Sequence, residues 1–136
     1  MKRIAMNRLL RGALVADAIA SGTLGALLAA LPAMLASLFS LPGAGLRYVG
    51  LFLIGYAAAV GALATRQRPL AILVWAVVIG NALWLIDSIL VVAGAWVAPT
   101  SLGYAFVVAQ ALAVGVFAEL QFVGLRRAVP LAAAAS

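Results

Sequence analysis

The stretch that decides the fold is residues 70–93, LAILVWAVVIGNALWLIDSILVVA, in which Asp87 is the only charged residue. A hydrocarbon core about 30 Å thick needs about 20 consecutive apolar residues to be crossed by a helix. Residues 70–93 meet that length and are apolar almost throughout. We therefore interpret them as a membrane-spanning helix.

Three more stretches of this kind occur in the chain. They run from Gly12 to Leu31, from Leu46 to Ala64 and from Leu102 to Leu125. After the first, Pro32 disfavours continuation of the helix, and Ala33 to Ser40 is too short to cross the membrane, so we expect a short interfacial helix there. The predicted fold is an all-α bundle of four transmembrane helices with this short helix between the first two, and residues 1–136 form one membrane domain.

The composition points the same way and excludes several functions. Of the residues, 68% are hydrophobic and only 9% are charged, whereas soluble domains have about 25% charged residues. The chain has no cysteine and no histidine, which removes the commonest metal and haem ligands and the usual neutral-pH general base. We expect no cofactor, no metal site, no catalytic residue and no nucleic-acid partner, and the composition argues against an enzyme.

The basic residues predict the orientation in the membrane. Eight of the nine fall on one side under the four-span interpretation: Lys2, Arg3, Arg8, Arg11, Arg66, Arg68, Arg126 and Arg127. Only Arg47 falls on the other side. Because basic loops are retained in the cytoplasm, both termini and the loop between spans two and three are expected to be cytoplasmic.

A cleaved signal peptide is the alternative interpretation of residues 1–35, since a basic segment there precedes an apolar one. The apolar core of a signal peptide has about 7 to 15 residues. The stretch here is longer than that, and Asp17 interrupts it, so we favour a membrane span.

All three acidic residues, Asp17, Asp87 and Glu119, fall inside predicted spans, where a charge costs about 2.5–3.5 kcal/mol at the helix centre. Asp87 and Arg47 lie toward the same side, and we predict that they form an ion pair; the alternative is that Arg47 binds lipid phosphate and Asp87 is neutral. Asp17 and Glu119 both lie roughly 10 Å inside the opposite boundary. We expect them to form a mixed-charge cluster with nearby arginines, or else one carboxyl to be protonated.

Uncharged polar residues fall nearer the middle of the spans: Tyr56, Asn81 and Gln110, with Ser21 and Thr23 at a similar depth. At 100° per residue, Asn81, Trp84 and Ser88 share a narrow helix face, with Asp87 beside it. Asp17, Ser21 and Gly25 align next to a small-residue surface suited to close helix packing. The candidate functional or structural polar residues are therefore Asp17, Arg47, Tyr56, Asn81, Trp84, Asp87, Gln110 and Glu119.

The fourth span has two polar faces, one with Gln110, Phe117 and Gln121 and the opposite one with Glu119. One helix cannot turn both faces to the centre of one bundle. Either this span packs between two neighbours within the chain or one face meets another molecule. We therefore expect a homo-oligomer or a larger membrane complex, with lipid around it.

Three segments carry a resemblance to a known group: NALWLIDS at 81–88, TSLGYAFVVAQ at 100–110 and FAELQ at 117–121. The chain resembles uncharacterised small four-span bacterial integral membrane proteins, broadly the DoxX-like group, over most of its length. The resemblance implies a four-helix fold in a bacterial inner membrane. It implies no catalytic residue.

Three classes of function are compatible with these patterns. A small structural or accessory subunit is favoured, because small-residue faces and buried polar residues are all that it needs. A small transporter or channel would use the intramembrane carboxylates as a pathway, although no midplane helix break or inverted repeat is evident. A membrane enzyme or quinone-binding protein ranks third.

Overall fold

The computed structural model describes residues 1–94 and 97–132 and is helical in the way the sequence predicts. The long helices are α1 (Arg8–Ala30), α3 (Gly43–Ala64), α4 (Ala71–Val92) and α5 (Ser101–Arg127), and α2 (Pro32–Phe39) is short. Each of the four long helices is long and apolar enough to cross a membrane. The four-helix bundle with a short helix between the first two spans is thus confirmed, and the protein has the architecture of a multi-pass membrane protein.

Local chemistry sets the helix ends. α1 begins four residues earlier than predicted because the Asn7 side chain caps it, its Oδ1 accepting from the Leu10 backbone N–H at 2.8 Å. Thr100 caps α5 in the same manner, with Oγ1 accepting from Gly103 N–H at 3.0 Å. A side-chain acceptor at this position satisfies a backbone donor that has no partner within the helix.

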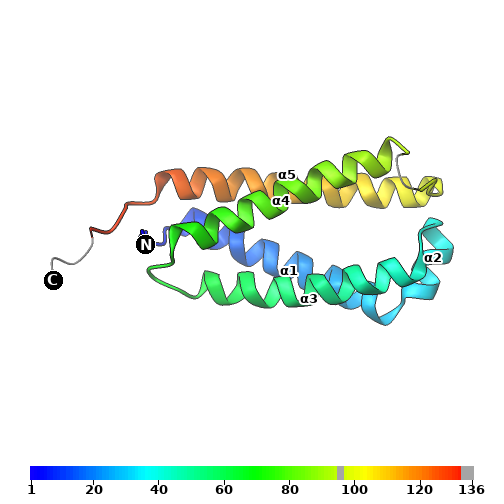
Figure 1. Ribbon diagram of the computed structural model, residues 1–136, viewed down its shortest axis with the longest axis horizontal. Coiled ribbons are helices and arrows are strands. Elements are labelled where there is room, and N and C mark those ends of the chain that lie inside the picture. Colours follow the sequence, from blue (N-terminus) through cyan, green and yellow to red (C-terminus); the bar gives the residue numbers. More distant parts are fainter. Residues whose placement is uncertain (95–96, 133–136) are drawn as a thin grey trace.

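The four long helices run lengthwise in Figure 1, and their contacts follow the order α3–α1–α5–α4, which makes an open square. α1 packs mainly against α3 and also against α5, and α5 packs against α4, whereas α3 and α4 make few contacts with each other. At one end, α2 contacts the start of α5, where Phe39 stacks on Phe106 with ring centroids 4.6 Å apart. The side of the square between α3 and α4 is therefore the loosely packed one.

The opposite end of the bundle is closed by the N-terminal segment, which the sequence did not predict. Its backbone joins the α3–α4 loop, with Ile4 N–H donating to Pro69 O at 3.1 Å. It also joins the segment after α5, with Ala5 N–H donating to Val129 O at 2.9 Å. Figure 1 shows the N-terminus and the α3–α4 loop at this end, so the eight basic residues assigned to one side do lie together.

The contact between α1 and α3 confirms the predicted small-residue surface. A Cβ added to Gly25 would lie 2.8 Å from the Gly50 carbonyl oxygen, and one added to Gly50 would lie 2.5 Å from the Ala29 nitrogen. The two backbones are therefore closer here than any larger residue permits. In the same interface, a Cβ at Gly22 would lie at an ordinary 3.4 Å from the Ala57 side chain.

We predict that Gly50→Ala destabilises the bundle by about 1–3 kcal/mol, the usual cost of overpacking a close contact. Gly55→Ala is the matched control in the same helix, because a Cβ there would meet nothing within 4 Å. Thermal unfolding in detergent compares the two variants. Equal midpoints would contradict the close approach of α1 and α3.

Candidate functional site

A fully buried carboxylate lies where the four long helices meet. Asp17 is 0% exposed, and Ser21, one turn further along α1, donates to its Oδ1 at 3.0 Å. The Tyr56 hydroxyl on α3 donates to its Oδ2 at 2.9 Å. Asn81 Nδ2 on α4 and Gln121 Nε2 on α5 each donate to the same oxygen at 2.8 Å. One side chain thus accepts hydrogen bonds from all four long helices.

The donors are also joined to each other. The Tyr56 hydroxyl lies 3.0 Å from Asn81 Oδ1, and Asn81 Nδ2 donates to Gln121 Oε1 at 2.9 Å. A carboxylate has about four acceptor positions, and four donors point at this one. The group is therefore satisfied by neutral partners, which is what permits a carboxyl to lie in an apolar bundle.

This arrangement corrects the prediction of a charged cluster around Asp17 and Glu119. The partners of Asp17 are neutral side chains, and no arginine is among them. Asp17 also lies directly against Tyr56 and Asn81, so it belongs to the central polar layer and not to a separate level nearer the helix end. Glu119 is exposed on the outside of α5, on the face opposite the one that supplies Gln121.

A second polar cluster joins α4 to α5. Trp84 Nε1 donates to Gln110 Oε1 at 2.6 Å, and Gln110 Nε2 donates to Ser88 Oγ at 2.9 Å. Ser88 Oγ in turn donates to the Trp84 carbonyl at 2.8 Å. The predicted face of α4 is therefore real, but it serves two clusters, because Asn81 joins Asp17 while Trp84 and Ser88 join Gln110. Thr23, expected in the central layer, is exposed.

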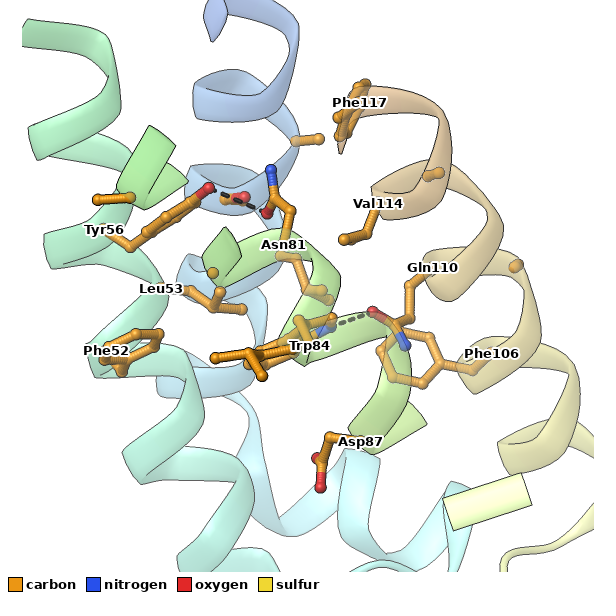
Figure 2. Close-up of a pocket in the computed structure, with 18 residues that line it drawn as sticks. Phe52, Leu53, Tyr56, Asn81, Trp84, Asp87, Phe106, Gln110, Val114 and Phe117 are labelled. Atoms are coloured by element: carbon orange, nitrogen blue, oxygen red, sulfur yellow. Dashed lines mark hydrogen bonds between the residues drawn. The ribbon is translucent and has the colours of Figure 1, made fainter. Parts of the chain in front are cut away.

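A cavity of about 810 Å³ lies between the two clusters and the α3–α4 gap. This volume is within the range of small-molecule sites, about 300–1,000 Å³. Its walls come from all four long helices and are mostly apolar and aromatic (Figure 2). Its aromatic and polar lining residues are Ser21, Phe52, Tyr56, Asn81, Trp84, Asp87, Phe106, Gln110 and Phe117.

The cavity is partly open to the outside of the bundle. Phe52 on α3 and Leu83 on α4 line the cavity and are also exposed on the outer surface. These residues flank the side where α3 and α4 are in least contact. The loosely packed side of the bundle, between α3 and α4, therefore adjoins the cavity.

Tyr56 separates this cavity from a second one nearer the chain termini. The second cavity, of about 600 Å³, also lies between α3 and α4 and is lined by Arg3 and Arg66 among apolar residues. Tyr56 and Ala76 line both cavities. The hydroxyl of Tyr56 reaches Asp17 and Asn81, so the buried network forms the partition between the two spaces.

Asp87 and Arg47 do not form the predicted ion pair. Asp87 lines the 810 Å³ cavity, at the end beyond Trp84 in Figure 2. Arg47 is the fifth residue of α3 and is exposed. No nitrogen of Arg47 comes within 4.0 Å of the Asp87 carboxylate in the structure. Arginine can reach the membrane boundary instead, because its long side chain extends toward the polar headgroups.

Five of the eight candidate polar residues line the cavity and one lies directly behind its wall. Those that line it are Tyr56, Asn81, Trp84, Asp87 and Gln110. Asp17 lies behind it, while Arg47 and Glu119 lie on the outer surface. Gln121 was missed as a site residue, although its shared helix face with Gln110 was a usable signal.

Comparisons with protein-family models, with curated proteins and with solved structures find no match to this chain. The four long apolar helices suggest a multi-pass membrane protein. The geometry of the cavity and of its polar clusters is therefore the basis for inferring a function.

We predict that Asp17→Ala lowers the free energy of unfolding by about 2 kcal/mol or more, because several buried donors lose their shared acceptor and each unsatisfied group costs about 1–3 kcal/mol. Ser21→Ala should cost far less, about 0.6 kcal/mol, since it removes only one side-chain hydrogen bond, within α1, and leaves the three donors from the other helices in place. Thr23→Ala, at an exposed position of the same helix, is the matched control and should leave the midpoint nearly unchanged. If Asp17→Ala and the control had the same midpoint of thermal unfolding, the role of Asp17 as shared acceptor would be contradicted.

Proposed function

We propose that the protein binds a lipid-soluble small molecule inside the membrane, in the cavity lined by α1, α3, α4 and α5. The observation that carries the proposal is the cavity itself, which is drug-sized, aromatic and partly open at lipid depth. Small-molecule sites are typically apolar clefts with a few well-placed polar groups. Here every polar lining residue except Asp87 belongs to one of the two hydrogen-bonded clusters.

The structure of the Asp17 network supports binding over ion conduction. Its carboxylate is fully buried and held by four side-chain donors. Glu119 lines neither of the two cavities described above. A pathway through both carboxylates, the basis of the transporter interpretation, would therefore have to leave the cavities to reach Glu119.

Filling the cavity tests the proposal. Gly80 lines the cavity, and a Cβ there would meet nothing within 4 Å, so Gly80→Leu adds side-chain volume at the cavity wall from a Cβ that meets no neighbour. We predict that purified protein in detergent binds the neutral dye N-phenyl-1-naphthylamine saturably, seen as quenching of tryptophan fluorescence by energy transfer. Gly80→Leu should weaken this saturable component by about tenfold or more, which corresponds to about 1.4 kcal/mol.

Gly55→Leu is the matched control, because Gly55 also has open space around its Cβ position but lies outside the lining of both cavities. It should bind the dye as the native protein does. Partition of dye into micelles is linear in dye concentration and is subtracted. Saturable binding that is absent, or equal in all three proteins, would overturn the proposal.

A second candidate function, a subunit of a homo-oligomer, is supported by the outer face of α5. Glu119 is exposed there together with Leu112 and Val116, which are 66% and 52% exposed. Charged residues inside membrane spans almost always face protein or water and not lipid. A second copy of the chain packed on this face would bury Glu119.

The absence of cysteine from the chain allows a clean crosslinking test. We predict that Val116→Cys forms a disulfide-linked dimer in native membranes under mild oxidation. Ile19→Cys, on the exposed side of α1, is the matched control and should stay monomeric. Monomer alone from both variants would count against an α5 interface.

A further inference from the structure

Asp87 is the one side chain of the cavity whose charge has no counterpart among the described residues. The lining includes no lysine and no arginine. No hydrogen bond or ion pair of the structure involves the Asp87 carboxylate, and Arg47 at the same end of the bundle does not reach it. Asp87 is exposed and lines the cavity near the last turns of α4. A carboxylate within a membrane span ordinarily has a partner, and a cation bound at this end of the cavity would supply one.

The other polar groups of the cavity have already used their donors. The Trp84 indole N–H is bonded to Gln110, and the Gln110 amide is bonded to Ser88. The Tyr56 hydroxyl is bonded to Asp17. The lining therefore offers an anion no free strong donor, while it offers a cation a carboxylate.

The aromatic residues of the cavity favour a cation as well. Phe52, Trp84 and Phe106 line the same space as Asp87. Aromatic faces attract organic cations through the ring quadrupole, most strongly where water is excluded. A lipophilic cation can thus place its positive charge near Asp87 and its apolar groups among the rings.

We propose that the molecule bound in this cavity is a lipid-soluble organic cation, an ammonium or phosphonium compound with aromatic or alkyl substituents, whose charge is paired with Asp87. This inference rests on the proposed function, and it narrows the ligand from any lipid-soluble compound to one of positive charge. The second cavity has the opposite character, since Arg3 and Arg66 line it. Asp87 therefore assigns the cation to the cavity on its own side of Tyr56.

Two probes of nearly equal size and opposite charge provide the test: tetraphenylphosphonium and tetraphenylborate. Saturable quenching of tryptophan fluorescence in a neutral detergent gives the affinity of each. The phosphonium should bind the native protein at least about tenfold more tightly than the borate, because the carboxylate attracts one and repels the other.

Variants show which carboxylate makes the protein prefer the phosphonium to the borate. Asp87→Asn should weaken phosphonium binding by about tenfold or more, and Asp87→Glu, which keeps the charge, should restore most of it. Glu119→Gln is the matched control: it removes a carboxylate outside the cavity and should leave phosphonium binding within about twofold of native. Thermal unfolding of each variant shows that the bundle is intact.

The outcomes separate the two proposals. If the neutral dye N-phenyl-1-naphthylamine binds saturably but the phosphonium and the borate bind alike, the cation proposal is wrong and the binding function stands. The cation proposal also fails if Asp87→Asn binds the phosphonium as tightly as the native protein does. If none of the three probes binds saturably, both proposals fail.

Discussion

The carboxylate of Asp17 accepts hydrogen bonds from side chains on α1, α3, α4 and α5, and the arrangement of the bundle depends on this shared acceptor. Between apolar helices in lipid, hydrophobic burial gives little direction to packing, so close contacts and polar bonds decide it. The Gly25–Gly50 approach fixes α1 against α3. Asp17 then fixes the rotation of every long helix, because a donor that turned away would leave buried polar groups unsatisfied.

The same network determines where the bundle is open. Tyr56 bridges from α3 to Asp17 and Asn81 across the side of the square that is otherwise least packed. It therefore holds α3 and α4 together at one level and leaves space on either side, an aromatic cavity with an acid and a second cavity with arginines. The proposed ligand site thus exists because α3 and α4 do not pack along their length and, among the residues that the structure describes, are joined only where Tyr56 bonds to Asp17 and Asn81.

The sequence predicted the fold well because membrane-spanning segments are defined by length and hydropathy, which are local properties. It also predicted the polar face of α4 and the small-residue face of α1, since helical periodicity places those residues without any knowledge of neighbours.

The partners of Asp17 and Asp87 were predicted wrongly. Depth counted along single helices placed Asp17 with Glu119, whereas the rotation of α5 brings Gln121 to Asp17 and turns Glu119 outward. The sequence placed Gln121 and Glu119 on opposite faces of α5, but which face turns inward is set by contacts between helices and cannot be read from one segment. The backbone pairing of residues 2–6 was missed for the same reason.

The most direct test of the central claim is a double-mutant cycle between Tyr56 and Gln121, which donate to the same oxygen of Asp17 from different helices. The free energies of unfolding of Tyr56→Phe, Gln121→Leu and the double variant are measured in one detergent. A shared acceptor predicts losses that depart from additivity by more than about 0.5 kcal/mol, because each donor's bond depends on the position in which the other holds Asp17. Losses that add to within about 0.3 kcal/mol would mean that the two donors act independently, and would contradict the view that Asp17 joins the four helices as one unit.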